Sequence, residues 1–453
     1  MAIQIVDKAG RNARPVKLVR GALEEAGLTK TELAWAAANG FDGKAGRMLA
    51  TAGSDGDIGS VLFGCAGAEG SALEFAALAK GLPDGAWRID ADASPLEVLG
   101  LVLGSYDYTR YRAATSRVVT IAAPRGADLK QARQIADGVF LARDLINTPT
   151  NEMGPDDLER ETRELARRHK AKVSVIAGDK LLDAGLNMIH AVGRAAGQAP
   201  RLIDLRWGQR NAPKVTLVGK GVCFDTGGLD IKTAAGMLLM KKDMGGAANV
   251  LGLASMIMSA GLKLRLRVLI PAVENSISAT AFRPGDVLKS RKGLTVEIGN
   301  TDAEGRLILA DALAVADEEE PDLLIDMATL TGAARVALGP DLPPYYTDND
   351  AFAGELEQAS AAVLDPMWRM PLWRPYASKL SSRIADMNNV TTDGLAGSIT
   401  AALFLQRFVE KARVWVHFDI FGWNPGEKSW SPVGGEAQCI RALRRLLEQR
   451  YGA

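Results

Sequence analysis

Apolar and polar positions along the chain follow two alternating patterns. Short runs rich in Val, Ile and Leu recur between longer stretches in which apolar residues return at helical spacing. The runs predict strands and the stretches predict helices. The expected strands span residues 59–67, 85–90, 116–124, 172–177, 200–207, 214–219, 264–273, 294–299 and 322–330, and the expected helices span 72–82, 94–111, 127–147, 245–261 and 306–317. This alternation is typical of an α/β protein with a mainly parallel sheet covered on both faces.

A chain of 453 residues is too long for one ordinary core, so we expect two domains. Residues 1–125 are predicted to form an N-terminal α/β domain. They contain no cluster of His, Cys or carboxylate residues at ligand spacing, which favours a structural or assembly role. The helix at 127–147 ends where Asn147 and Pro149 cannot continue it. We expect this helix to link the first domain to a larger α/β/α domain, the two together forming residues 126–453.

Composition narrows the class of protein. The chain has 54 Lys and Arg residues against 54 Asp and Glu residues, and a net charge of zero does not indicate a nucleic-acid binder. Its three cysteines (Cys65, Cys223 and Cys439) are odd in number and far apart, which fits a reducing compartment. The N-terminus lacks the apolar core of a signal peptide, and no apolar run is long enough for a bilayer. We therefore predict a soluble, cytoplasmic protein with no membrane partner.

Polar side chains gather where the expected strands end. The strand at 214–219 runs through a glycine-rich segment into Lys220, Asp225, Lys232 and Asp243. The phosphate-binding loop pattern fails in this segment because Gly221 stands where Ser or Thr is required. The dinucleotide pattern fails because its third glycine is absent. The segment therefore disfavours nucleotide binding.

A second polar segment, NTDAEGRL, begins at Asn300 and follows another expected strand. A calcium loop that starts at Asp302 is excluded because Arg306 occupies its fifth position. Ligands of parallel sheets bind outside the carboxyl ends of the strands, so we expect four carboxylates to converge there: Asp225, Asp243, Asp302 and Glu304. Converging carboxylates repel one another, and a pair of divalent cations would relieve that repulsion. The sequence predicts an oxygen-rich two-metal site.

Several further segments accompany NTDAEGRL with preserved spacing. They are RDLINTPTNEMGP (143–155), AVGRAAGQAPRLIDL (191–205), VGKGVCFDTGGLDIK (218–232), MKKDMGGAA (240–248), MATLTGA (327–333) and GSITAALFLQRFV (397–409). Together they resemble the leucyl aminopeptidase family, the M17-type dinuclear metalloaminopeptidases or cytosol aminopeptidases. The N-terminal part resembles the family only loosely, at GSYDYTRY (104–111).

The resemblance implies a metal-dependent aminopeptidase, a hydrolase that cleaves the N-terminal peptide bond of peptides through a metal-bridging water. It implies a metallopeptidase domain at 126–453, a homohexamer, two divalent ions per subunit (Zn²⁺ or Mn²⁺, with Mg²⁺ also compatible) and a bicarbonate held by Arg306 to shuttle a proton. The implied metal ligands are Lys220, Asp225, Asp243, Asp302 and Glu304. The implied catalytic residues are Lys232 and Arg306, and the implied substrate-binding residues are Met240, Asn300, Thr329, Leu330 and Gly332.

These residue types suit the implied chemistry. A lysine ligates a metal only as the neutral amine, so a cation at Lys220 must depress its pKa. Lys232 can remain charged and stabilise the oxyanion of the tetrahedral intermediate. A substrate amine can coordinate a metal beside Asp243 only when it is terminal and uncharged, which predicts exopeptidase activity. The pocket residues Met240 and Leu330 favour apolar side chains.

The sequence departs from the usual family pattern at a few positions. Asp230 stands where Ser is usual, Thr233 stands where Pro is usual, and the wall formed by residues 419–425 reads DIFGWNP. His417 lies in an apolar run, which favours a core histidine, and a small buried residue explains Cys223 better than a nucleophile. Some family members bind DNA, and others could be inactive. The zero net charge disfavours the first alternative, and retention of every implied ligand disfavours the second.

Overall fold

The computed structural model describes residues 3–67, 70–113 and 117–452. It divides the chain into two compact units, Met1–Asp137 with Gly426–Val433 and Gly138–Pro425 with Gly434–Ala453. The start of the strand expected at 116–124 lies outside the described residues. Helix α4 (Leu129–Asn147) contains the point of division, close to the helix expected at 127–147. Across the described residues, every helix is too short or too polar to cross a lipid bilayer.

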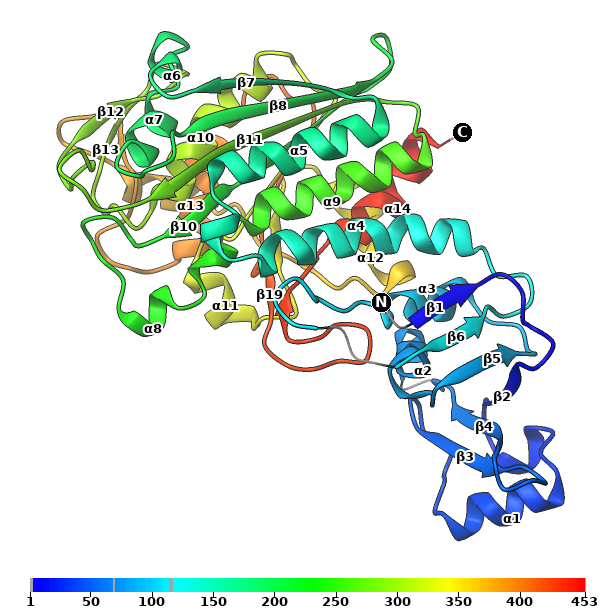
Figure 1. The fold of residues 1–453 in the computed structure, drawn as a ribbon. Coiled ribbons are helices and arrows are strands. Elements are labelled where there is room, and N and C mark those ends of the chain that lie inside the picture. Colours follow the sequence, from blue (N-terminus) through cyan, green and yellow to red (C-terminus); the bar gives the residue numbers. More distant parts are fainter. Residues whose placement is uncertain (1–2, 68–69, 114–116, 453) are drawn as a thin grey trace. The chain divides into compact units, whose positions relative to one another are not determined.

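The first unit is built on a sheet with the strand order β1-β6-β5-β2-β4-β3 (Figure 1). Strand β3 is antiparallel to β4, and the other neighbouring strands are parallel. Its core includes the buried side chains of Trp87, Phe63 and Phe75. The elements are β1 (Ile3–Val6), β2 (Arg14–Val19), η1 (Leu23–Glu25), α1 (Lys30–Ala38), β3 (Met48–Ala52), β4 (Ile58–Gly64), η2 (Ala72–Phe75), α2 (Ala76–Gly81), β5 (Gly85–Ile89), α3 (Pro95–Leu103) and β6 (Val119–Ala122).

Sequence patterns locate most of these elements. The strands expected near 59–67, 85–90 and 116–124 are confirmed as β4, β5 and β6. The helix expected at 94–111 is shorter than predicted, because α3 ends at Leu103. Gly104 follows it, and glycine weakens a helix. The N-terminus of α3 carries a capping box, in which Ser94 and Glu97 each accept a hydrogen bond from the other's backbone N–H.

Glu97 also binds Arg20 at the end of β2, with Nη1 donating to Oε1 at 2.7 Å. Burial alone would raise the pKa of Glu97, but the hydrogen bonds from Arg20 and Ser94 hold it below its usual value. A depressed carboxylate pKa stabilises the fold above the unfolded value near 4.5 and loses that contribution as the pH falls through the folded value.

We expect Glu97→Gln to lower the stability of this unit by about 2 kcal/mol at pH 7, since hydrogen bonds to a charged group contribute roughly 1.5–3 kcal/mol. The difference from wild type should narrow as the pH falls below 4.5. The difference in stability between the variant and the wild type is measured by amide hydrogen exchange in β2 and β5, corrected for intrinsic exchange rates. The exposed Glu24→Gln serves as the control. A difference independent of pH would show that packing, rather than the carboxylate charge, stabilises α3.

The second unit contains a mixed sheet with the order β16-β15-β18-β14-β9-β11-β8-β7, with β10 paired to β11. Pairs β9–β11, β9–β14, β14–β18, β10–β11 and β15–β16 are parallel, while β8 is antiparallel to β7 and β11, and β15 to β18. These strands are β7 (Lys172–Ala177), β8 (Arg201–Gly208), β9 (Lys214–Gly219), β10 (Gly221–Asp225), β11 (Arg265–Asn275), β14 (Leu323–Ala328), β15 (Pro344–Tyr346), β16 (Trp368–Arg369) and β18 (Trp415–Asp419). The predicted α/β class with a mainly parallel mixed sheet is confirmed.

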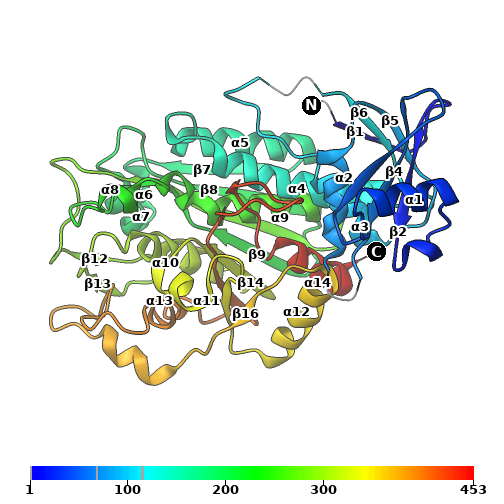
Figure 2. The same ribbon diagram turned by 90° about the horizontal axis from the view of Figure 1, so that it is seen from below.

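Helices cover both faces of this sheet, and every residue of β14 is buried (Figures 1 and 2). Helices α7 and α10 pack against β9 and β11 through a core that includes Val218, Leu269 and Leu307, and α5 and α9 also contact β11. The helices and 3₁₀ turns are η3 (Thr150–Glu152), α5 (Pro155–His169), α6 (Lys180–Asp183), α7 (Asn187–Gly193), α8 (Ala234–Met237), η4 (Met240–Met244), α9 (Gly245–Ala260), α10 (Glu304–Asp317), α11 (Gly332–Leu338), α12 (Asp350–Val363), η5 (Arg374–Leu380), α13 (Gly397–Gln406) and α14 (Ile440–Tyr451).

Two small sheets complete this unit, and one of them corrects a sequence expectation. The strand expected at 294–299 exists as β13 (Thr295–Glu297), but it pairs with β12 (Val287–Lys289) and β17 (Met387–Asn388). It is therefore not a neighbour of β9 in the main sheet, and the polar segment after it reaches the site from a different sheet. The other small sheet joins β19 (Trp423–Asn424) to β20 (Gly434–Gly435).

Helix α10 is anchored by two buried carboxylates along its length. Asp311 accepts hydrogen bonds from the backbone N–H groups of Met188, Ile189 and Arg291. Asp317, the last residue of α10, accepts hydrogen bonds from three consecutive backbone N–H groups in segment 410–412. Each carboxylate thus pairs with backbone donors of segments outside the helix. These bonds fix the axial position of α10.

Candidate active site

Asp225 ends strand β10, which the sequence analysis treated as part of a glycine-rich loop. Residues 221–225 are instead extended and pair in parallel with β11. Asn275, the last residue of β11, donates its Nδ2 to Asp225 Oδ1 at 2.8 Å, and Gly227 N donates to the same oxygen at 2.9 Å. The other oxygen, Oδ2, lies 2.8 Å from Lys232 Nζ. The paired strands therefore fix the orientation of this carboxylate.

Lys220 links strands β9 and β10 and is only 3% exposed. Its Nζ lies 2.7 Å from Asp243 Oδ2 and 3.0 Å from Glu304 Oε1, and it donates to the carbonyl oxygen of Thr329 at 3.1 Å. Gly305 makes room for this side chain, because a Cβ there would stand 2.5 Å from Lys220 Cε. The lysine is thus enclosed by the ends of the main sheet and the first turn of α10.

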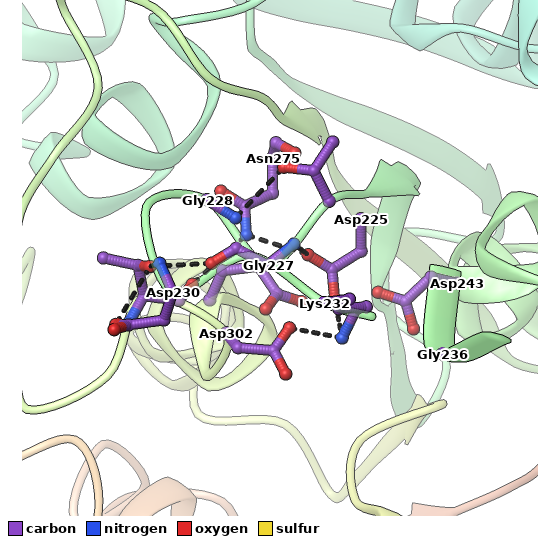
Figure 3. Close-up of polar contacts among 12 residues, drawn as sticks. Asp225, Gly227, Gly228, Asp230, Lys232, Gly236, Asp243, Asn275 and Asp302 are labelled. Atoms are coloured by element: carbon purple, nitrogen blue, oxygen red, sulfur yellow. Dashed lines mark hydrogen bonds and ion pairs between the residues drawn. The ribbon is translucent and has the colours of Figure 1, made fainter. Parts of the chain in front are cut away.

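Asp302 and Glu304 come from the start of α10. Asp302 N donates to Asn300 Oδ1 at 2.7 Å, which holds the turn before the helix. Carboxylate oxygens of Asp225, Asp302 and Glu304 all lie within 4.8 Å of one another. Figure 3 shows the carboxylates of Asp225, Asp243 and Asp302 turned towards one another, with the Lys232 ammonium bonded to Asp225 and Asp302. The predicted convergence of carboxylates is therefore seen in the structure.

The loop from Gly227 to Lys232 is tied to the α10 turn by Thr301 and Asp230 (Figure 3). Asp230 N donates to Thr301 Oγ1 at 2.9 Å, and Thr301 N donates back to Asp230 Oδ2 at 2.8 Å. Gly228 adopts a φ of +66°, a conformation that favours glycine. Two departures from the family pattern thus have structural roles: Asp230 braces this loop, and Thr233 caps α8 through Gly236 N.

Arg306 lies one turn into α10 and is buried. Its Nη1 donates to the carbonyl oxygen of Asn389 at 2.6 Å, whereas its Nε has no hydrogen-bond partner among the described residues. Asn389 in turn accepts from Gly299 N at 2.8 Å and donates to Asn300 O at 2.7 Å. Burial lowers the pKa of Arg306 to about 10. The guanidinium therefore has an unpaired donor that could bind an anion.

Charge in the site is unbalanced towards the negative. Burial, and after it the Asp225 carboxylate, raises the pKa of Asp302 to about 6, although Lys232 opposes the change. The same two causes raise the pKa of Glu304 well above its usual value. Burial alone would lower the pKa of Lys220 and Lys232, but the facing carboxylates raise both. Four carboxylates around two ammonium groups leave a local excess of negative charge that favours bound cations.

Three carboxylate oxygens that lack a well-aligned hydrogen bond support the fit of divalent metal ions to this donor set. In the part of the chain that the structure describes, neither oxygen of Glu304 accepts a hydrogen bond of good geometry, and neither does Asp243 Oδ2. Buried carboxylate oxygens are normally hydrogen-bonded, because an unpaired one is costly. Oxygen ligands suit Zn²⁺, Mn²⁺ and Mg²⁺. The residues present therefore fit the predicted pair of metal ions.

Three of the five residues expected to bind substrate adjoin the segments that carry these carboxylates. Thr329 Oγ1 donates to Asp243 Oδ1 at 2.8 Å, and Met240 begins the same 3₁₀ turn as Asp243. Leu330 N donates to Asp419 Oδ1 at 3.0 Å. Gly332 is exposed at the start of α11, and Asn300 adjoins Asp302. The structure thus brings Met240, Thr329 and Asn300 into contact with elements that carry the proposed ligands.

Two residues excluded from the site are placed in the core. His417 is fully buried, with Nδ1 2.5 Å from Asp326 Oδ1, and Trp415 Nε1 donates to Asp326 Oδ2 at 2.8 Å. The prediction of a core histidine is confirmed. Cys223 is also fully buried, and burial raises the pKa of its thiol well above the usual value. A thiol that stays protonated is a poor nucleophile, in agreement with its interpretation as a packing residue.

Known proteins match both parts of the chain. Residues 140–444 match the family described as cytosol aminopeptidase family, catalytic domain, and residues 17–124 match M17 aminopeptidase, N-terminal domain. A probable cytosol aminopeptidase of Clostridium perfringens is 37% identical over 78% of this chain and 75% of its own. One from Geobacter sp. is 41% identical over 78% of this chain and 74% of its own. The chain belongs to the cytosol aminopeptidase family, M17.

Solved structures agree with this membership. The crystal structure of cytosol aminopeptidase from Coxiella burnetii superposes with a TM-score of 0.94, at 46% identity and over 99% of both chains. The bottromycin maturation enzyme BotP in complex with Mn superposes with a TM-score of 0.87, at 34% identity, over 97% of this chain and 99% of its own. The protein is thus a hydrolase with the two-domain M17 architecture, a metal-dependent exopeptidase that acts on the N-terminal bond of peptides.

Proposed function

We propose that the chain hydrolyses the N-terminal bond of peptides at the carboxylate cluster, with Lys220, Asp225, Asp243, Asp302 and Glu304 as ligands of two divalent ions. The observation that carries this proposal is the approach of the Asp225, Asp302 and Glu304 oxygens to within 4.8 Å of one another. When bound, such a pair of ions would polarise the scissile carbonyl and activate water near neutral pH. The complex of BotP with Mn supports Mn²⁺ as one suitable ion, alongside Zn²⁺ and Mg²⁺.

The cationic residues Lys232 and Arg306 have separate tasks in this proposal. Lys232 is held beside Asp225 and Asp302, where its ammonium can donate to the oxyanion that develops on the substrate carbonyl. Arg306 offers its unpaired Nε to an anion, for which bicarbonate is the proposed occupant and proton carrier. A bidentate guanidinium suits a planar oxyanion. In this proposal both residues contact the reacting groups, and neither is a metal ligand.

The substrate is held by its free N-terminus and its first side chain. Asp243, which accepts a hydrogen bond from the Thr329 hydroxyl, would hold the metal ion to which a neutral terminal amine coordinates. Met240, Asn300, Thr329, Leu330 and Gly332 are the proposed contacts of the substrate. An internal peptide bond offers no terminal amine, which supports an exclusively exopeptidase action.

Residues 1–125 have the proposed role of an assembly domain in a homohexamer, and residues 126–453 that of the linker helix and metallopeptidase domain. The match of residues 17–124 to a domain found in this family supports the first assignment. The names of the relatives support a cytoplasmic location. Sedimentation velocity of the full chain tests the assembly, and a species of monomer mass alone would contradict it.

Removal of metal should abolish activity reversibly. We expect protein stripped with a chelator to release no N-terminal residue from a leucyl amide, and added Mn²⁺ or Zn²⁺ to restore release. The same substrate with an acetylated amine should remain intact under every metal, because it cannot present a terminal amine. Rates of amine release measure both results. Full activity after stripping, or cleavage of the acetylated substrate, would contradict the proposed mechanism.

A further inference from the structure

Two cationic side chains lie against one aromatic ring close to the proposed site. Lys242 Nζ stands 4.9 Å from the ring centroid of Phe421, and the Arg335 guanidinium carbon stands 5.3 Å from the same centroid. Lys242 comes from η4, Arg335 from α11, and Phe421 follows β18. Three elements that are distant in sequence therefore bring two positive charges to one place.

Lys242 is a buried lysine that forms no ion pair within the described residues, although the carboxylates of Asp243 and Asp419 lie near it. It is 3% exposed, and its Nζ forms no hydrogen bond or ion pair with any residue that the structure describes. Its sequence neighbour Lys241, by comparison, donates to Asn147 O at 2.7 Å. Burial disfavours an ammonium group that is not paired with a carboxylate. Such a side chain is expected where a ligand supplies the missing charge.

Asp419 is the carboxylate nearest to Arg335, with Oδ1 3.6 Å from Nη1, but its oxygens already serve other donors. Leu330 N and Thr331 N donate to Oδ1, and the Thr331 hydroxyl donates to Oδ2 at 2.6 Å. Arg335 Nη1 has no hydrogen-bond partner among the described residues. Both side chains at Phe421 thus retain N–H groups that could donate hydrogen bonds to a further carboxylate.

The cations adjoin the proposed contacts of the substrate's first side chain. Lys242 lies between Met240 and Asp243 in one 3₁₀ turn. The segment Thr329–Leu330 is bonded to Asp243 on one side and to Asp419 on the other, and Phe421 follows Asp419 by two residues. A Cβ on Gly422 would stand 3.2 Å from Thr329 Cγ2, so the chain after β18 packs on this segment. The segment DIFGWNP (419–425), which differs from the family pattern, therefore contributes the Phe421 ring that both side chains contact.

We propose that Lys242, assisted by Arg335, binds the side-chain carboxylate of an N-terminal glutamate or aspartate, so that the enzyme prefers peptides with an acidic first residue. The inference rests on the proposed function, because it uses the same substrate orientation. Met240 and Leu330 contact the methylene groups, and the ammonium receives the carboxylate. A leucine side chain there leaves the ammonium unpaired, and a glutamine side chain offers a neutral oxygen, which forms a weaker hydrogen bond.

Glutamate and glutamine substrates differ in charge but hardly in shape, so they isolate this contact. With the metal-loaded full chain, we expect kcat/KM for a glutamyl anilide to exceed that for the glutaminyl anilide by about tenfold or more. In Lys242→Met the ratio should fall towards one, while the rate for the leucyl anilide is kept or raised. Lys241→Met, which removes a positive charge from the next residue, should keep the wild-type ratio. Equal rates for both substrates in the wild type would overturn the inference.

Binding of free amino acids separates failure of this inference from failure of the proposed function. Calorimetry with the metal-loaded protein should show tighter binding of glutamate than of glutamine, and loss of that difference in Lys242→Met. Cleavage of leucyl and glutaminyl anilides without a glutamyl preference overturns the acidic specificity and leaves the aminopeptidase mechanism intact. If no anilide is cleaved, the proposed mechanism fails. Calorimetry then decides alone whether Lys242 binds the side-chain carboxylate: tighter binding of glutamate than of glutamine supports this role, and equal binding overturns it.

Discussion

We expect Glu304→Gln to lower kcat/KM for a leucyl amide by about a thousandfold or more, because a two-metal site contributes several kcal/mol to the transition state and each 1.36 kcal/mol is tenfold in rate. Glutamine keeps the volume of the side chain at the first position of α10, so the fold is retained. It carries no charge, however, and an amide nitrogen would face the site in place of one of two oxygens that lack hydrogen bonds. Steady-state rates, together with metal content after dialysis, measure the effect.

A matched variant on the same helix controls for this change. Glu318 follows α10 at its other end, is half exposed and pairs with Arg291 at 2.8 Å. Glu318→Gln therefore removes the same charge without touching the carboxylate cluster, and it should retain wild-type rates and metal content. Glu304→Gln should bind fewer than two equivalents of metal at a concentration that saturates the wild type. If it binds both ions and cleaves at the wild-type rate, Glu304 is not a ligand.

We expect Lys232→Met to lower kcat by about 10²–10³-fold, the effect of removing one donor to a developing oxyanion. Its ammonium is bonded to Asp225 and Asp302, so its removal leaves those carboxylates more negative. Metal affinity should therefore be unchanged or higher, opposite in sign to the effect of Glu304→Gln. Loss of an interaction that is made only in the transition state lowers kcat and kcat/KM equally. Rates and metal titrations on the same preparation measure both quantities.

The pair of variants distinguishes a ligand from a catalytic residue. If Lys232→Met lost metal together with activity, the lysine would be acting on the metals, and its role at the oxyanion would be refuted. If KM rose while kcat stayed constant, Lys232 would be holding the ground state of the substrate.

Much of this arrangement could be predicted from sequence, because strand ends and helix starts have local signals. The apolar run at 214–219 and the helical spacing of 245–261 identify β9 and α9 closely. The polar residues between these two elements follow a buried strand. The octapeptide NTDAEGRL lies at a helix start as expected, since Glu304 is the first residue of α10. Carboxylates near a helix N-terminus are stabilised there by the helix dipole.

The rest depends on pairings that local patterns do not encode. Asn275 orients Asp225 only because β10 and β11 pair in parallel with 50 residues between them. Asn389 positions both Asn300 and Arg306 from 83 or more residues away. Lys242 is an ordinary charged residue in sequence, and only its burial against Phe421 sets it apart. The strand at 294–299 pairs outside the main sheet, and a short apolar run does not reveal which strands it pairs with.

Helix α10 joins the chemistry to the architecture of its unit. Its first residue is a proposed ligand, and further along the helix Asp311 and Asp317 each accept hydrogen bonds from three backbone N–H groups, which lie between 20 and 123 residues away in the sequence. A partial opening of α10 would break those bonds at the same time as it displaced Glu304. The site should therefore belong to the most cooperative part of the unit and open only when that part unfolds. Loss of activity on heating would then report the melting of the whole catalytic fold. A state in which the site is disordered while the rest of the fold is intact would not be populated.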